Sequence, residues 1–181
     1  MPALQHVLLL ALDTADWFGH DYVGTEHVLI ALARDSAGGA SRVLHRLTTH
    51  EAIVSRVSDL MGQAPVGPAP DDTAEAAHKR VALRFGPAAE VDPTFPPFTP
   101  RVLKVLEMTR DEASRRGDAE PSSEHLLVAL VREGGGLATA ALQQLNVTAG
   151  AVIAATEDHL SWKPLLDMVR EAELPPLEGA G

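Results

Sequence analysis

The sequence predicts an all-α fold of two four-helix repeats. These pack about a pseudo-twofold axis as eight helices, with a proline-rich linker between them and a short C-terminal tail. Hydrophobic residues make up 45% of the chain but aromatic residues only 4%, so the core is expected to consist of Leu, Val and Ala, a composition that favours helices. The chain also matches itself at an offset of 98 residues, and both matching segments carry apolar residues at helical spacing.

Glycine and polar residues support the internal repeat better than leucine does. Matches of Leu and Ala alone are weak evidence in a helical protein, whereas a glycine, a Glu-His pair and an arginine in one register are much harder to obtain by chance. The aligned pairs are Gly19 and Gly117, Glu26 and Glu124, His27 and His125, and Arg34 and Arg132. Because the histidines recur at the same place, we expect them to have a packing or hydrogen-bonding role.

The first copy, residues 1–62, predicts four helices. The first carries one apolar stripe and stops at Gly19. The second spans Val28–Arg34, with the Thr25 hydroxyl placed to cap free amides at its start. The third ends near Leu47, and the fourth, capped by Thr49, ends near Met61. The stripe consists of Leu4, Val7, Leu8, Ala11, Leu12 and Ala15.

The second copy, residues 98–160, repeats this order. Thr99 is a good N-cap and Pro100 suits the first helical position. The first helix stops at Gly117. The second helix spans Leu126–Arg132, with Ser123 as its candidate cap. The third helix ends near Leu145, and the fourth, capped by Thr148, ends near Leu160.

Composition changes outside the copies. Residues 63–97 are rich in Pro, Ala and Asp and predict a linker with a helical turn over Ala74–Leu83. The tail, residues 161–181, allows one short helix over Pro164–Ala172. Each copy is too small to bury its apolar faces well alone, so we expect the two copies to pack together.

Charge and composition exclude several classes of protein. The formal net charge of −10 disfavours binding to nucleic acid or to an anionic membrane, including the alternative of a small helical DNA-binding regulator. There are no cysteines for disulfides or thiolate chemistry. No stretch approaches 18 apolar residues, and the start, MPALQHVLLLAL, lacks the basic region of a signal peptide, so we expect a cytoplasmic protein.

Catalysis, metal binding and cofactor binding have little support. No Gly-Lys dipeptide is present for a phosphate-binding ATPase loop, and we expect no enzyme activity and no cofactor. His20, Asp21 and His27 could approach one another, but no histidine pair has the spacing of HExxH, so no metal site is predicted. Trp17 and Phe18 are expected to pack against the linker or the opposite copy; the alternative is a protein-contact patch.

At this point the motifs resemble a known family. The stretch GHDYVGTEHVLIALARD (Gly19–Asp35) resembles the signature of the Clp N-terminal repeat at the front of ClpA- and ClpC-type unfoldases, and the second copy shows it again within Phe98–Val147. The ClpC type is the more similar. This chain departs from the pattern in its longer linker and in Ser122-Ser123-Glu124-His125, which replaces the second GTEH.

The resemblance implies a docking platform for the protein substrates and adaptors of a proteolytic machine. In ClpC-type domains each repeat offers a pocket for phosphorylated arginine, a degradation mark. A helix N-terminus can hold the phosphate, and a carboxylate can hold the guanidinium. We therefore expect the helix start at Thr99, with the positive charge of Arg101 and Lys104, to face Glu124 across a solvent-open gap.

The first copy supplies fewer of these groups. Glu26 is present, but Met1, Ala3 and His6 stand where the second copy has Thr99, Arg101 and Lys104. We therefore predict that only the second pocket binds phosphoarginine appreciably. A structural alternative stays open: both glutamates favour their helix dipoles, Thr99 is also a simple cap, and the two cations also fit a solvated helix face. The protein would then be an interaction scaffold or a decoy regulator that binds other proteins, or a small-molecule ligand of Clp N-domains, without binding phosphoarginine.

Overall fold

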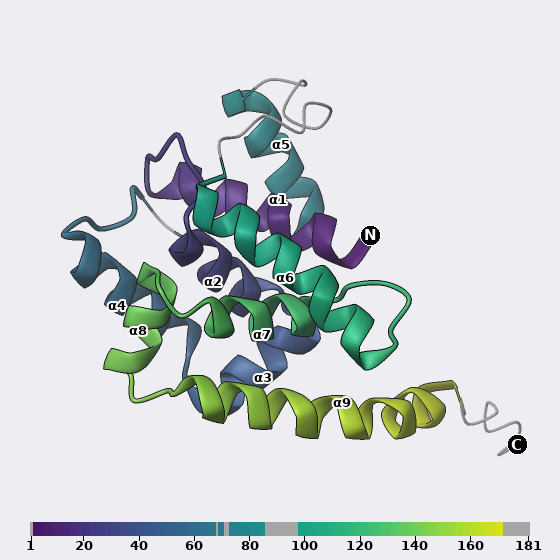
Figure 1. Ribbon diagram of the computed structural model, residues 1–181. Helices are drawn as coiled ribbons and strands as arrows, with labels where there is room; N and C mark the ends of the chain where they lie inside the picture. The colour runs from purple at the N-terminus through teal and green to yellow at the C-terminus, as the bar shows by residue number, and fades with distance from the viewer. Residues whose placement is uncertain (1, 68, 71–72, 86–97, 172–181) are drawn as a thin grey trace, which may run out of the picture.

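The prediction of an all-α fold is confirmed. A computed structural model describes residues 2–67, 69–70, 73–85 and 98–171, and these residues form nine helices and no strand, apart from one isolated parallel bridge between Val23 and Phe98 (Figure 1). The helices are α1 (Pro2–Trp17), α2 (Thr25–Arg34), α3 (Gly39–Leu47), α4 (His50–Met61), α5 (Ala74–Phe85), α6 (Pro100–Arg116), α7 (Ser123–Glu133), α8 (Leu137–Gln144) and α9 (Ala149–Glu171).

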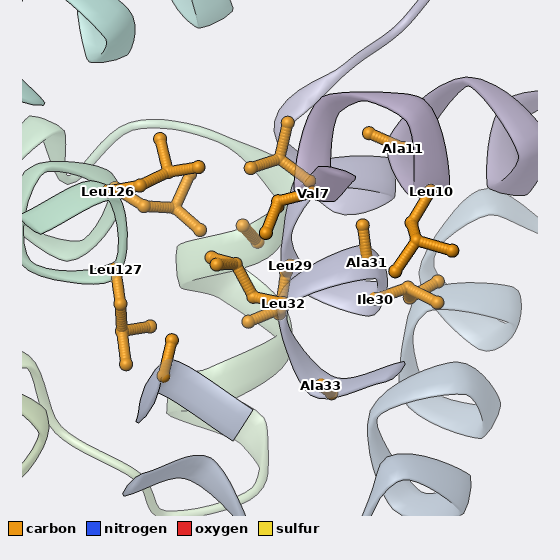
Figure 2. Close-up of a cluster of buried hydrophobic side chains, with 14 of the residues drawn as sticks. Val7, Leu10, Ala11, Leu29, Ile30, Ala31, Leu32, Ala33, Leu126 and Leu127 are labelled. Carbon is orange, nitrogen blue, oxygen red and sulfur yellow. The ribbon is translucent and has the colours of Figure 1, made fainter. Parts of the chain in front are cut away.

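The two copies interlock. The first two helices of each copy pack on each other, α1 on α2 and α6 on α7. The third helix of each copy contacts the second helix of its own copy and also packs against the second and fourth helices of the other copy, so α3 contacts α7 and α9 while α8 contacts α2 and α4. One apolar cluster runs through both copies, and Figure 2 shows side chains of α1, α2 and α7 meeting in it. Neither copy therefore has a separate core.

Most of the predicted helix boundaries are confirmed. Gly19 and Gly117 follow α1 and α6 with φ of 74° and 79°, in the left-handed region that a glycine adopts without strain. Thr49 and Thr148 accept hydrogen bonds from the amides of Ala52 and Ala151, each at 3.1 Å, as N-caps of α4 and α9. The stripe of α1 is buried at Leu4, Val7, Ala11, Leu12 and Ala15.

The prediction that Thr25 and Ser123 cap their own helices was wrong. Each hydroxyl accepts a hydrogen bond from the start of the third helix of the other copy: the Ala138 amide donates to Thr25 at 3.4 Å, and the Ala40 amide donates to Ser123 at 3.3 Å. The reason is that α2 and α7 begin at these residues themselves, so each side chain is free to turn toward the opposite copy. These reciprocal caps join the copies where the candidate site lies.

The linker adds a helix to the first copy. The predicted turn over Ala74–Leu83 is part of α5, which buries Ala77 and Val81 and lies along α1. Arg80 of α5 donates to the buried Asp13 at 2.5 and 3.0 Å. Linker residues 68, 71–72 and 86–97 lie outside the described part of the chain.

The expectation for Trp17 and Phe18 is confirmed. Phe18 is fully buried, and the Trp17 indole donates to the carbonyl of Gly67 in the linker at 3.4 Å. The aromatic pair therefore fastens the linker to α1 and does not form an exposed contact patch.

The predicted break between Leu160 and a separate helix at Pro164 was wrong. Helix α9 continues from Ala149 to Glu171, because a proline inside a helix removes one hydrogen bond without ending the helix in every context. Within the described residues, no single helix has the length and apolar character needed to cross a bilayer; only α8 with the first part of α9 meets that test, as a pair bent by 92°.

Candidate functional site

A pocket of about 400 Å³ lies where three helices of both copies begin. Its wall holds the starts of α2, α6 and α8, and each helix start presents backbone amides and the positive end of a helix dipole. The lining residues are Gly24, Thr25, Glu26, Thr99, Pro100, Arg101, Gly136 and Leu137. Convergence of three helix N-termini makes this a favourable place for an anion.

Backbone contacts between the two copies hold the start of α6 beside that of α2. The Thr99 amide donates to the carbonyl of Val23 at 3.0 Å, next to the bridge between Val23 and Phe98. The Thr99 hydroxyl accepts from the Val102 amide at 3.4 Å, and Pro100 occupies the first helical position, so Thr99 is the predicted N-cap. Thr99 and Pro100 therefore set where α6 begins, and the bridge between Val23 and Phe98 places the first turn of α6 in the pocket.

Glu26 is the carboxylate of this pocket, and it is buried. Glu26 is 4% exposed, and among the described residues the Thr25 hydroxyl, 3.4 Å away, is the neighbouring side chain that donates to it. Burial raises the pKa of the Glu26 carboxyl, although hydrogen bonds from its own amide and from Thr25 oppose the rise. Among the residues that the structure describes, no lysine or arginine pairs with Glu26.

A neutral histidine holds the loop beside Glu26. The Gly24 amide donates to Nδ1 of His27 at 2.9 Å, so the ring proton is on Nε2, which donates to Nδ1 of His20 at 2.9 Å. Burial and the neighbouring His20 lower the pKa of His27 to about 3, so its ring brings no positive charge to the Glu26 carboxylate 3.7 Å away. The predicted hydrogen-bonding role of His27 is confirmed, and His125 accepts likewise from the Ser122 amide at 3.0 Å.

The two predicted cations of α6 are already paired. Arg101 donates to both carboxylate oxygens of Glu133, at 2.7 and 2.9 Å, and Lys104 lies 3.4 Å from the same carboxylate. The hydrogen bond from Arg101 lowers the pKa of Glu133. Arg101 lines the pocket, whereas Lys104 lies outside it with 61% of its side chain exposed.

Comparison with known proteins identifies the family. The model of the Clp repeat (R) N-terminal domain matches residues 1–47 and 97–176. The chain belongs to the Clp repeat N-terminal domain family. It is 32% identical over 145 residues to the negative regulator of genetic competence ClpC/MecB of Bacillus subtilis (strain 168), and 33% identical over 144 residues to the chaperone protein ClpB of Oceanobacillus iheyensis.

Each of these matches covers 80% of this Clp N-domain but only 15% of the relative, so the chain spans a small part of the proteins that it matches. Among solved structures, the N-terminal domain of ClpD from Arabidopsis thaliana has a TM-score of 0.60 at 19% identity, covering 89% of this chain and 94% of that one. The fold is that of a Clp-associated protein-interaction module, and Clp N-domains generally bind protein substrates or adaptors.

Within this Clp N-domain, the predicted pairing of Thr99 with Glu124 was wrong. Thr99 and Arg101 share their pocket with Glu26, and Glu124 lies beside Gly39 and His159 instead. The sequence places Thr99 and Glu124 in the same repeat, but the interlocked packing brings the long helix of one copy to the Glu-His motif of the other. The asymmetry predicted from the sequence assumed one pocket in each copy, whereas the pocket at Thr99 combines residues of both copies.

No group of three His, Asp or Glu side chains within the described residues could hold a metal ion. His20 and His27 do meet, as the sequence suggested, but their ring nitrogens bond to each other and to a backbone amide.

Proposed function

We propose that this Clp N-domain is a non-enzymatic recognition module that binds phosphoarginine on protein substrates in the pocket of Glu26 and Thr99. In this proposal the module acts in the cytoplasm and serves a Clp unfoldase–protease, by delivering marked proteins or by competing for them. One observation carries the proposal: a buried carboxylate with no lysine or arginine partner in the described part of the chain lines a pocket at three helix N-termini.

The carboxylate supports recognition of a guanidinium. A buried charge without a partner destabilises the folded protein, and such groups are concentrated at functional sites, where a ligand supplies the opposite charge. A guanidinium presents two parallel N–H groups that match the two oxygens of a carboxylate. No lysine or arginine of the described residues pairs with Glu26, and a bound guanidinium would supply that positive charge.

The helix starts support recognition of a phosphate on the same ligand. The dipole ends of α2, α6 and α8 favour an anion, and Arg101 at the pocket wall adds a cation whose charge Glu133 partly offsets. A ligand with a guanidinium and a phosphate joined together satisfies both halves, whereas free arginine or inorganic phosphate satisfies only one.

Isothermal titration calorimetry with N-phospho-L-arginine tests the proposal. We expect saturable binding to the wild-type protein, and binding of free arginine or inorganic phosphate at least tenfold weaker, since each lost charge-assisted contact is worth about 1.5–3 kcal/mol. Glu26→Gln should weaken binding by at least tenfold, while Glu124→Gln serves as the matched control in the other copy. Wild-type affinity in Glu26→Gln, or equal affinity for free arginine, would refute the proposed site.

Pulldown from a lysate with and without protein-arginine-kinase treatment separates this function from a plain interaction scaffold. We expect additional captured proteins only after treatment, and their loss in Glu26→Gln. Capture that does not depend on the kinase would favour the scaffold.

A further inference from the structure

The pocket has a counterpart on the other side of the pseudo-twofold axis, formed by the start of α7 and the start of α3. The offset of 98 residues relates Thr25 and Glu26 to Ser123 and Glu124, and it relates Gly136 to Gly38. The reciprocal hydrogen bonds of Ser123 and Thr25 to α3 and α8 show that the two places share their construction. Glu124, at 3% exposed, is as buried as Glu26.

Two substitutions between the copies make the counterpart different. Leu137 lines the pocket of Glu26, but its equivalent at α3 is Gly39. The caps Thr49 and Thr148 set the alignment of the fourth helices, and that alignment puts His159 of α9 where α4 has Leu60.

These two substitutions act together around Glu124. His159 places Nε2 3.9 Å from Oε1 of Glu124, with side-chain exposures of 10% and 4%. A Cβ atom at Gly39 would lie 2.1 Å from that carboxylate oxygen and 2.9 Å from the imidazole nitrogen. A side chain at position 39 would therefore have to displace the Glu124 carboxylate and the His159 ring, whereas glycine leaves both in place.

We propose, on the basis of the function proposed above, that His159 is a built-in occupant of the Glu124 site, so that this Clp N-domain binds one phosphoarginine instead of two. The imidazole takes the position beside Glu124 that the ligand guanidinium takes beside Glu26. It is a hydrogen-bond donor and, when protonated, a counter-charge for Glu124. Since the ring is part of the folded chain, a ligand has to displace it before reaching the carboxylate.

The contrast between the two glutamates supports this assignment. Glu26 has an open pocket beside it and no lysine or arginine partner among the described residues, and the His27 ring 3.7 Å away is neutral, with its two nitrogens bonded to the Gly24 amide and to His20. Glu124 has His159 as a close neighbour and accepts a hydrogen bond from Ser123 at 2.9 Å. Each copy therefore has a buried carboxylate at the equivalent position, but the two differ in how open that carboxylate is to a ligand.

Calorimetric stoichiometry with N-phospho-L-arginine tests the inference. The wild-type protein should bind one equivalent, and Glu124→Gln should keep the wild-type affinity within about twofold. His159→Ala should bind two equivalents, the second more weakly because the sequence equivalent of the Thr99 cap in the first copy is methionine, Met1. Leu60→Ala, the matched change in the first copy, should leave the stoichiometry at one.

The outcomes separate this inference from the proposed function. Two equivalents on the wild-type protein, or one equivalent on a folded His159→Ala variant, would overturn the role of His159 and leave the Glu26 pocket standing. No binding to the wild-type protein but one equivalent on His159→Ala would overturn the Glu26 pocket and support the occupant. No binding to either protein would overturn both. If His159→Ala does not fold, His159→Leu serves instead, because the first copy has leucine at the equivalent position of its fourth helix.

Discussion

Replacing Glu26 with glutamine should make the protein more stable at neutral pH while it removes ligand binding. Glu26 is 4% exposed, and the one neighbouring side chain that donates to it within the described residues is Thr25, at 3.4 Å. The start of α2 favours the negative charge, but burial outweighs this effect and raises the pKa of Glu26. Glutamine keeps the shape without the buried charge, which should stabilise the fold by about 1 kcal/mol.

The raised pKa fixes the sign of the pH dependence. The folded protein holds the proton of Glu26 more tightly than the unfolded chain does, so this contribution to stability is present below the ordinary pKa of the carboxyl and is lost as the pH rises through the folded value. The advantage of Glu26→Gln over wild type should therefore be near zero at low pH and full at pH 7.

Urea denaturation of both proteins at pH 4 and pH 7 measures this difference. At pH 7 the melting temperature should also rise by roughly 2–4 °C for a chain of this size. Glu124→Gln is the control and should bring no gain, because Glu124 has His159 beside it. A Glu26→Gln variant less stable than wild type at pH 7, or equally stabilised at both pH values, would refute the reasoning.

Three further predictions concern the scaffold of the site. Asp13→Asn removes the buried ionic partner of Arg34, 3.0 Å away, and should cost roughly 3–5 kcal/mol in urea denaturation, whereas Glu112→Gln in the more exposed equivalent network should cost less; equal costs would contradict this. His27, with a pKa of about 3, should show no titration by NMR between pH 8 and pH 5, and a midpoint within that range would disprove the buried neutral ring. Because His27 stays neutral in the folded protein but is protonated in the unfolded chain, the free energy of unfolding should also fall as the pH drops below about 6.5. Thr99→Ala should lose about 1 kcal/mol of stability with its N-cap and also weaken phosphoarginine binding; unchanged binding would place the ligand away from α6.

Local signals along the chain were sufficient to predict most of the helix boundaries. The repeat, the glycine stops and the threonine caps depend on neighbouring residues, and the structure confirms them at Gly19, Gly117, Thr49 and Thr148. Helix α9 was missed beyond Leu160 because Pro164 is equally compatible with a helix start and with a helix interior, and no local signal distinguishes the two.

Contacts between the copies could not be predicted from the order of residues. The motif residues Thr99 and Glu26 were identified, but their partnership depends on the bridge between Val23 and Phe98 and on the interlocked packing, which no single repeat encodes. The same packing turns the Thr25 hydroxyl away from its own helix. His159 was overlooked, although a comparison of the fourth helices, aligned on their caps, shows histidine against Leu60 and would have singled it out.

An NMR titration of the isotope-labelled protein with N-phospho-L-arginine tests the central claim most directly. The account predicts that the largest amide shifts occur at the starts of α2, α6 and α8, at Thr25, Arg101 and Leu137, and that they disappear in Glu26→Gln. Shifts centred on Ser123 and Glu124 at the start of α7, or none at the three helix starts under saturating ligand, would contradict it.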